Sequence, residues 1–559
     1  MIKTKIIDKN LNKLCNIYKI SLKSFLFPSY NSFAAGNGKS AVCKMRKGKM
    51  ATVVKSFSVD GIEGFPIEIE ASLIQGMPCI SIIGLGDQAV QEAGDRIRAA
   101  VIGSGYRIPA SKLILSLAPG DQKKSGSHYD LGMAVAMLIE SGQITAESLP
   151  DYGLIGELSL NGNLRPTNGI LPMVIKAKEV GVKRIVVPAE NEAEAKLISG
   201  IEVVGLRTLQ QVIDLLAGRK VSIIKDDPAV EKAGKYEKDF SEVHGQDEII
   251  EAVALGVAGG HNILMIGEPG CGKTMIAERI PTIMPQMTEK EALDVTKIQS
   301  VVGMLAPNHA LVTARPFRAP HHNASLNSLI GGGNPAMPGE VSLAHNGVLF
   351  FDELPEFQRS ALEALRQPME NKNVTIARVN GTHTYPANFM FVAAMNPCPC
   401  GYFPGKKCHC SDYEIRQYRR KISGPILDRI DIQKTVKPVG YFDMLNSPAT
   451  YSSATLRELV SKAREIQIRR FAAYENVNSN SQMSASLIRD FCRLDSESEE
   501  LLKSASSING YSARVINKLL RVARTAADMR GAADIQKQDV ARVLRCRDLD
   551  MENAGLYTV

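Results

Sequence analysis

Continuous apolar runs and helix-spaced apolar positions predict the main elements of the chain. Residues 263–266, 348–351 and 389–395 are continuous apolar runs, which is typical of parallel strands that helices cover on both faces. Later in the chain, apolar side chains recur at three- and four-residue spacing, which predicts a helix with one buried face. These side chains are Val515, Leu519, Val522 and Ala526. The pattern therefore predicts an α/β core followed by a helical region.

The same pattern divides the chain into six segments. In order, we expect a basic extension over 1–49, an α/β domain over 50–219, a polar linker over 220–239, an α/β core over 240–445, a helical connector over 446–484 and a helical lid over 485–559. The first α/β domain is expected to open with a strand at 53–59, where the pattern turns strand-like. Ser512 is expected to cap a lid helix, because its hydroxyl can accept a hydrogen bond from a free backbone N–H.

A phosphate-binding pattern, G-x-x-x-x-G-K-[ST], follows the first apolar run. In such a loop the glycines let backbone N–H groups surround phosphate oxygens, while Lys273 reaches the β- and γ-phosphates and Thr274 holds Mg²⁺. A chance glycine-rich turn is the alternative, but the strand before and the helix-like segment after it favour binding of ATP with Mg²⁺. The predicted contact residues are Gly267, Glu268, Pro269, Gly270, Cys271, Gly272, Lys273 and Thr274.

Polar side chains stand at the ends of the other two apolar runs. Asp352 and Glu353 follow 348–351, and we expect Asp352 to orient Mg²⁺ and Glu353 to polarise the attacking water. An ordinary strand end with two solvated acids is the alternative, which the preceding phosphate loop makes less attractive. Asn396 ends the third run, where its amide can bind the γ-phosphate or the water without adding charge.

Two arginines extend this ordered series of polar residues. Arg429 and Arg514 each lie in an otherwise apolar setting, and the series resembles the AAA+ ATPases. The resemblance implies that Asn396 is sensor 1, that Arg429 is a finger donated to the neighbouring subunit, and that Arg514 is sensor 2. Together with Glu353, these three residues are the predicted catalytic residues.

Four longer motifs are similar to the magnesium-chelatase-like branch of that family. They lie at 315–322, 329–333, 338–347 and 396–401, and the resemblance runs from about residue 50 to about residue 550. It implies a cytoplasmic, hexameric, ATP-driven DNA helicase that moves branch points in recombination or natural transformation. Branched or single-stranded DNA and other recombination proteins are the partners that this implies.

Residues 50–219 resemble the Lon protease domain, an α/β domain of the ribosomal S5 domain 2-like type. The resemblance rests on 155–166 and 181–191. Where that family has its catalytic serine and lysine, this chain has Tyr129 and Leu171, so both catalytic groups are missing. Ser127 and Lys176 leave a shifted dyad as the alternative. We favour a nonproteolytic scaffold that helps to assemble a ring or to grip DNA.

The formal net charge of +8 does not by itself indicate nucleic-acid binding. Residues 1–49 contain eleven basic residues and one acid, so the other 510 residues, with 56 basic and 58 acidic side chains, carry −2. DNA contacts must therefore come from local patches. For residues 1–49 a nucleic-acid arm or a targeting segment is possible, but we favour a disordered upstream extension from a misassigned start. No apolar run approaches eighteen residues, so no membrane span is expected.

Two segments are candidates for DNA contact. Residues 374–385 alternate with period two around Asn380 and Gly381, which predicts a β-hairpin, and residues 315–322 are expected to form a second pore-facing loop. The basic side chains predicted to contact DNA phosphates are Arg315, Arg318, Arg378 and His383. A hairpin that packs a subunit interface is the alternative.

Four of the ten cysteines form two C-x-C pairs separated by seven residues. They are Cys398, Cys400, Cys408 and Cys410. Such a set can present four thiolates to one Zn²⁺, with disulfides as the alternative that a reducing compartment disfavours. The other six cysteines show no pairing pattern and are expected to be free thiols.

Three classes of function remain after these observations. A magnesium-chelatase-like motor for metal insertion is the main alternative, but the Lon-like domain and the four-cysteine insertion are not expected there. The missing dyad argues against a protease. An ATP-driven DNA motor accounts for the Lon-like domain, the hairpin and the local basic segments together.

Overall fold

The computed structural model describes residues 51–221, 236–305, 311–333, 336–378, 381–440, 449–474 and 477–549. Its contacts separate a unit Met1–Met50 from a unit Ala51–Val559. The expectations for the basic extension, for most of the linker and for Asn380 lie outside the described residues, as does the side chain of Arg378. Within the described parts, no helix is both long enough and apolar enough for a membrane crossing.

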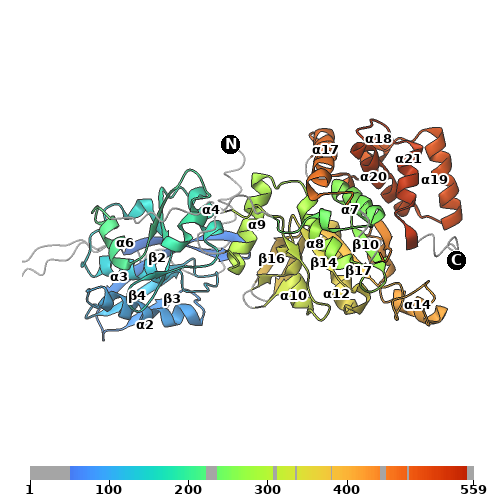
Figure 1. Ribbon diagram of the computed structural model, residues 1–559. Helices are drawn as coiled ribbons and strands as arrows, with labels where there is room; N and C mark the ends of the chain where they lie inside the picture. The colour runs from blue at the N-terminus through green and yellow to red at the C-terminus, as the bar shows by residue number, and fades with distance from the viewer. Residues whose placement is uncertain are drawn as a thin grey trace, which may run out of the picture. The chain divides into compact units, whose positions relative to one another are not determined.

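The first domain is built on a seven-stranded mixed sheet with the order β3-β4-β2-β1-β5-β8-β9 (Figure 1). The strands are β1 (Thr52–Asp60), β2 (Glu63–Ile74), β3 (Ile80–Ile83), β4 (Lys112–Ala118), β5 (Tyr152–Leu154), β8 (Arg184–Pro188) and β9 (Glu202–Leu206). The expected strand at 53–59 is confirmed as the centre of β1. β1, β2 and β4 pair antiparallel, and the other neighbours pair parallel.

Both faces of this sheet are covered, because its strands carry apolar side chains on both sides. Val54 belongs to a core formed with α2, α3 and α6, whereas Phe57 belongs to a second core formed with α4. The helices of the domain are α2 (Gln88–Gly103), α3 (Asp130–Glu140), α4 (Ile170–Glu179), α5 (Glu192–Ala195) and α6 (Leu209–Leu216), and a small ribbon pairs β6 (Glu157–Leu158) with β7 (Leu164–Arg165).

The second domain has a five-stranded parallel sheet with the order β11-β14-β17-β10-β18. The strands are β10 (Ile263–Gly267), β11 (Phe317–Arg318), β14 (Val348–Phe351), β17 (Met390–Met395) and β18 (Ile432–Val436). The three apolar runs predicted as strands are confirmed as β10, β14 and β17, and every residue of these strands is buried. Because neighbouring strands run parallel, β10, β14 and β17 end at the same edge of the sheet.

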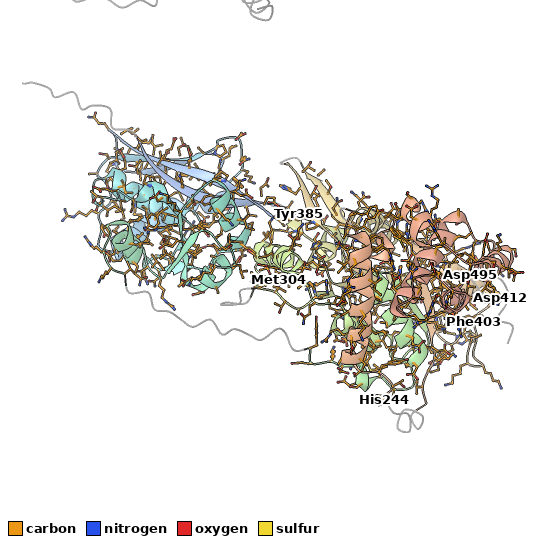
Figure 2. All side chains as sticks on the ribbon, turned by 90° about the horizontal axis from the view of Figure 1, so that it is seen from above. His244, Met304, Tyr385, Phe403, Asp412 and Asp495 are labelled. Carbon is orange, nitrogen blue, oxygen red and sulfur yellow. The ribbon has the colours of Figure 1, made fainter. Side chains whose placement is uncertain are left out.

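Helices surround this sheet, and a hairpin precedes its central strand β17. The helices of the core are α7 (Asp247–Gly259), α8 (Lys273–Ile283), α9 (Glu289–Val302), α10 (Leu326–Ile330), α11 (Glu340–Leu343), α12 (Arg359–Ala364), α13 (Arg366–Asn371), α14 (Asp412–Arg419) and α15 (Gly424–Leu427), with a ribbon of β12 (Gly331–Gly332) and β13 (Met337–Pro338). The predicted hairpin is confirmed: β15 (Asn373–Arg378) pairs antiparallel with β16 (Gly381–Pro386). Figure 2 shows Tyr385 on this hairpin.

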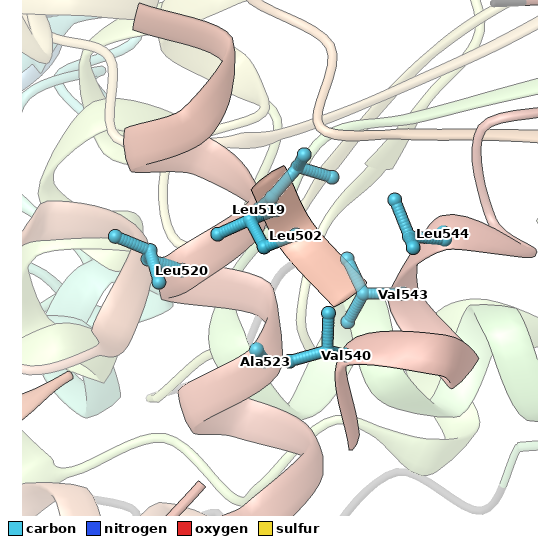
Figure 3. Close-up of a pocket in the computed structure, with 7 residues that line it drawn as sticks. All are labelled: Leu502, Leu519, Leu520, Ala523, Val540, Val543 and Leu544. Atoms are coloured by element: carbon cyan, nitrogen blue, oxygen red, sulfur yellow. The ribbon is translucent and has the colours of Figure 1, made fainter. Parts of the chain in front are cut away.

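The C-terminal region is helical. It contains α17 (Ser453–Phe471), α18 (Ala485–Phe491), α19 (Ser496–Asn509), α20 (Ala513–Met529) and α21 (Lys537–Leu544). Ser512 caps α20 as predicted, accepting a hydrogen bond from the backbone N–H of Val515. The predicted apolar face of α20 is also confirmed, since Leu519, Val522 and Ala526 are buried and Val515 packs beside them. Figure 3 shows a small apolar pocket inside this region, lined by Leu502, Leu519, Leu520, Ala523, Val540, Val543 and Leu544.

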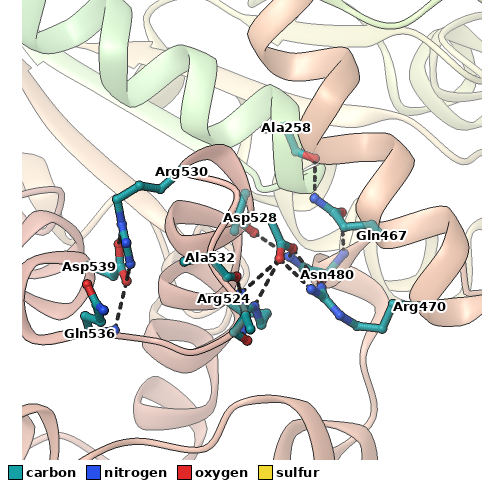
Figure 4. Close-up of polar contacts among 12 residues, drawn as sticks. Ala258, Gln467, Arg470, Asn480, Arg524, Asp528, Arg530, Ala532, Gln536 and Asp539 are labelled. Carbon is teal, nitrogen blue, oxygen red and sulfur yellow. Dashed lines mark hydrogen bonds and ion pairs between the residues drawn. The ribbon is translucent and has the colours of Figure 1, made fainter.

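A buried charge network joins α20 to the connector helix α17 (Figure 4). The carboxylate of Asp528, which is 1% exposed, accepts hydrogen bonds from Arg470 at 2.7 Å, Asn480 at 2.8 Å and Arg524 at 3.1 Å. Gln467 of α17 donates a hydrogen bond to the backbone oxygen of Ala258 in α7 at 3.0 Å. The C-terminal helices are therefore attached to the sheet domain by polar as well as apolar contacts.

Candidate nucleotide-binding site

The phosphate loop joins β10 to α8 at the carboxyl edge of the five-stranded sheet. Gly270 and Gly272 have φ angles of 78° and 90°, a left-handed conformation that glycine adopts without strain. Lys273 is the first residue of α8. The N-terminus of α8 therefore lies at the loop where phosphate is expected to bind.

Lys273 connects this loop to the end of the third predicted strand. Its Nζ donates hydrogen bonds to the backbone oxygens of Gly267 at 2.7 Å and Glu268 at 2.9 Å. It also lies 3.3 Å from Oδ1 of Asn396, directly after β17. The structure thus brings together a lysine and an amide that the sequence analysis placed in one site.

Thr274 and Asp352 form the second pair in this site. The Thr274 hydroxyl donates a hydrogen bond of 2.8 Å to Oδ2 of Asp352, and Oδ1 of Asp352 accepts one from the N–H of Glu353. A hydroxyl and a carboxylate are oxygen ligands of the kind that Mg²⁺ prefers when phosphates supply further ligands. The pair therefore fits the expected magnesium site.

Glu353 has an unusual backbone and a partner that the sequence analysis did not assign to it. Its φ is 51°, a left-handed conformation that is uncommon for a side chain larger than asparagine and is found preferentially at functional sites. Its Oε2 lies 3.7 Å from Nδ1 of His322, which follows β11, the strand beside β14. The sequence alone could not predict this contact, because it does not show that β11 pairs with β14.

The two predicted arginines lie on neighbouring segments and have acidic partners within the chain. Arg429 forms an ion pair with Glu370. Arg514, in the first turn of α20, lies 3.8 Å from Oδ2 of Asp428. Among the described residues no recorded contact joins either arginine to Lys273, so their catalytic roles stay predictions.

The two arginines of the second predicted DNA-contacting loop have partners within the chain. The Arg315 side chain is 10% exposed and donates hydrogen bonds to the backbone oxygens of Pro285 and Asn346 at 2.6 and 2.7 Å. Burial also lowers its pKa. Arg318 binds both carboxylate oxygens of Glu340, at 2.6 and 2.8 Å. Both side chains therefore fasten the loop to the domain, and their contact with DNA stays a prediction.

Of the hairpin residues expected to contact DNA, His383 also has a partner. Its Nδ1 lies 3.2 Å from Oδ1 of Asp60, and its side chain is 16% exposed. The contact of His383 with DNA stays a prediction.

The positions aligned with the Lon dyad form part of the interior of the first domain. Tyr129 is fully buried and donates a hydrogen bond of 2.6 Å to the hydroxyl of Ser58, and burial raises the pKa of its phenol. Leu171 is also fully buried. The alternative dyad is not assembled, because Ser127 donates to Glu157 whereas Lys176 pairs with Glu179.

The four clustered cysteines converge as the C-x-C pairs predicted. Their sulfur atoms all lie within 4.8 Å of one another. The separations are 3.3 Å for Cys398–Cys400, 3.7 Å for Cys398–Cys408 and 3.6 Å for Cys400–Cys408.

These features define a class of protein, a P-loop nucleotide-binding ATPase of the AAA+ type with a helical lid. Three family models match, described as "Magnesium chelatase, subunit ChlI" over residues 239–444, "Subunit ChlI of Mg-chelatase" over 69–191 and "Magnesium chelatase, subunit ChlI C-terminal" over 450–547. Membership in this family implies ATP and Mg²⁺ as cofactors.

Similar proteins identify the type within this family. The chain is 39% identical over 501 residues to YifB of Escherichia coli (strain K12), and 36% identical over 501 residues to the competence protein ComM of Haemophilus influenzae. Each match covers 89% of this chain and 97% of the relative. A segment is 26% identical over 162 residues to Lon protease 2 of Bacillus subtilis, covering 26% of this chain and 29% of that protein. The chain belongs to the ComM/YifB type of the magnesium-chelatase-like AAA+ family.

Proposed function

We propose that this protein is an ATP-driven DNA motor that works as a homo-hexamer on branched or single-stranded DNA in recombination or natural transformation. The observation that carries the proposal is the direct chain connection between the hairpin and the nucleotide site. β16 ends at Pro386, β17 begins at Met390, and Asn396 follows β17 beside Lys273. A change at the phosphates can therefore reach the hairpin through one buried strand. One relative is named a competence protein, which is consistent with the proposed role in natural transformation.

Each residue of the nucleotide site has a distinct task in this proposal. Lys273 exchanges its bonds to loop carbonyls for the β- and γ-phosphates, and Asn396 follows that movement. Thr274 and Asp352 hold Mg²⁺, which neutralises the charge on the phosphates when it is bound. Glu353 accepts a proton from the attacking water.

The hairpin has one anchored face and one exposed polar face. Val374, Ile376 and Tyr385 are buried in the core beneath it, and the Tyr385 hydroxyl donates a hydrogen bond of 2.8 Å to the backbone oxygen of Ala336. Thr375 and Thr384 face the exposed side, 3.1 Å apart between their hydroxyls. Hydroxyl and backbone groups can contact a DNA backbone without reading its sequence. The hairpin is thus suited to sequence-independent contact.

Assembly into a ring gives Arg429 a second partner. Within the chain it is paired with Glu370, and on ring formation we propose that it leaves this carboxylate for the γ-phosphate bound by the neighbouring subunit. An arginine supplied in this way stabilises the charge of the phosphoryl-transfer transition state. This requirement makes hydrolysis dependent on assembly.

The test is ATP turnover by the full-length protein with a four-way DNA junction, with single-stranded DNA, with porphyrin and Mg²⁺, and with an unfolded protein. Lys273→Ala measures background in every arm. Stimulation by DNA, together with ATP-dependent movement of the junction, supports the proposal. Stimulation by the porphyrin mixture alone would favour the metal-insertion alternative, and stimulation by unfolded protein alone would favour a protein-unfolding motor. A chain that begins at Met50 tests whether the basic extension, rather than the hairpin, provides the DNA contact.

A further inference from the structure

We infer that Cys398, Cys400, Cys408 and Cys410 bind one structural Zn²⁺, and that this zinc site holds the phosphate loop and Asn396 in their binding geometry. All four sulfur atoms lie within 4.8 Å of one another, close enough to share one metal ion. In a tetrahedral site with Zn–S bonds of about 2.3 Å, neighbouring sulfurs are about 3.8 Å apart. The three separations of 3.3 to 3.7 Å approach this value, whereas a disulfide requires about 2.05 Å.

The backbone between the cysteines makes the tight turns that such a site needs. Gly401 donates its N–H to the carbonyl of Cys398 at 3.0 Å, and Cys408 donates its N–H to the carbonyl of Gly405 at 2.9 Å. Gly401 has a φ of 87°, which a residue with a side chain adopts only with strain. The turns direct the cysteines of both pairs toward one point. Four thiolate ligands and no open position indicate a structural zinc site rather than a catalytic one.

This cysteine loop lies directly against the phosphate loop. A Cβ placed on Gly401 would lie 2.8 Å from Cγ and Cδ of Pro269, and one placed on Gly405 would lie 3.6 Å from Oε1 of Glu268. Pro269 and Glu268 are two of the residues predicted to surround the phosphates. The cysteine loop therefore packs against the phosphate loop.

The same segment is also attached to the end of β17 and to α14. Asn396 is two residues before Cys398, and Ser411, directly after Cys410, is the N-cap of α14. Arg419 of α14 donates a hydrogen bond of 3.3 Å to the backbone oxygen of Pro397 and lies over the ring of Phe403 at 5.6 Å. Figure 2 shows Phe403 and Asp412 of this segment. A metal bound by the two C-x-C pairs would cross-link residues 398–410, directly after Asn396 at the end of β17.

Zinc occupancy should consequently determine nucleotide affinity. Without the metal, the cysteine loop loses its cross-link. The contact of Gly401 with Pro269 and the position of Asn396 are then no longer fixed. The loss of one well-placed hydrogen bond to a charged group would weaken binding of an ATP analogue by about tenfold, equivalent to about 1.4 kcal/mol. This inference rests on the nucleotide site and does not require DNA to be the substrate.

The test uses the full-length protein purified without chelator. Metal analysis should give one zinc per chain for the wild type and for Cys79→Ser, a control that removes an exposed cysteine of the first domain, and almost none for Cys408→Ser. A fluorescent ATP analogue should bind about tenfold more weakly after the wild type is stripped of zinc, and added Zn²⁺ should restore the affinity. Stripping the wild type keeps the test valid even if Cys408→Ser fails to fold.

Three results would overturn the inference. Protein that contains no zinc, or that contains iron instead, would show that the assignment of zinc is wrong. Oxidation of the four thiols to disulfides in freshly isolated protein would show that the sulfurs are paired with each other. Unchanged nucleotide affinity after complete zinc removal would show that the metal does not influence the phosphate loop. DNA is absent from every arm, so failure of the DNA-motor proposal has no effect on these outcomes.

Discussion

Lys273 Nζ lies 3.3 Å from Asn396 Oδ1, across 123 positions of sequence. Both residues stand where neighbouring parallel strands, β10 and β17, reach the same sheet edge. The lysine is thus held inside its own loop by carbonyl and amide oxygens, all of which it can exchange for phosphate oxygens. In the proposed mechanism, Asn396 would therefore respond when Lys273 leaves this contact for nucleotide.

Lys273→Ala should abolish ATP hydrolysis and weaken ATP binding by roughly tenfold to a hundredfold. The reason is the loss of charge-assisted hydrogen bonds to phosphate, each worth about 1.5–3 kcal/mol. Equilibrium binding of a fluorescent ATP analogue measures the effect. Lys462→Ala, which removes an exposed lysine of α17, should leave affinity unchanged. Equal affinity of Lys273→Ala and the wild type would contradict the site.

Glu353→Gln should retain ATP binding and lose turnover by about 10²- to 10⁴-fold, the usual contribution of a general base. Thr274 and Asp352 are untouched by this change, so the magnesium ligands remain. Rapid filtration should recover bound, unhydrolysed ATP from the variant. Hydrolysis at the wild-type rate would show that another group activates the water.

His322→Ala should lower the turnover number without changing the KM for ATP, because the histidine contacts Glu353 and none of the phosphate-loop residues in the described structure. Its contact with Glu353 is partly exposed, and exposed polar contacts of this kind contribute about 0.2–1 kcal/mol, so the decrease should not exceed about fivefold. Steady-state kinetics separate the two parameters. The neighbouring His321→Ala is the matched control, and a larger effect there would refute a positioning role for His322.

Mixtures of Arg429→Ala and Lys273→Ala subunits test the proposed ring. Each variant alone should be nearly inactive, since an arginine finger contributes about 10³- to 10⁵-fold in the systems where it is measured. Mixed rings should regain part of the ATPase activity, because an intact finger can meet an intact phosphate loop. Glu370→Ala, which removes the partner of Arg429 within the chain, should remain active. Confirmed co-assembly without recovery would exclude a role in trans.

Asp528→Ala should destabilise the C-terminal helices by about 3–5 kcal/mol, because Arg470 and Arg524 would stay buried without their carboxylate. Chemical denaturation followed by circular dichroism measures the change. The control Glu499→Ala removes an exposed i,i+4 pair with Lys503 and should cost only about 0.3–0.5 kcal/mol. Similar losses for both variants would show that the buried network contributes little.

Local signals predicted much of this structure. Apolar runs and glycine-rich turns identified β10, β14, β17 and the hairpin, because strand burial and turn geometry depend on neighbouring residues. The cysteine spacing likewise predicted that the four sulfurs would converge. The closest partners of Arg315 could not be predicted, since they are the backbone oxygens of Pro285 and Asn346, which lie about thirty residues away on either side. His322 was assigned to a different surface because only the strand order places β11 beside the strand that ends at Glu353.

The buried Tyr129–Ser58 contact opposes the introduction of a Lon-type dyad. A serine at position 129 would remove an aromatic ring from the interior, and such large-to-small changes cost about 3–5 kcal/mol. A lysine at Leu171 would place a charge where the leucine side chain is fully buried. Each first step toward a catalytic dyad would therefore lower stability before it gave any activity, so the packed interior of the domain opposes both changes.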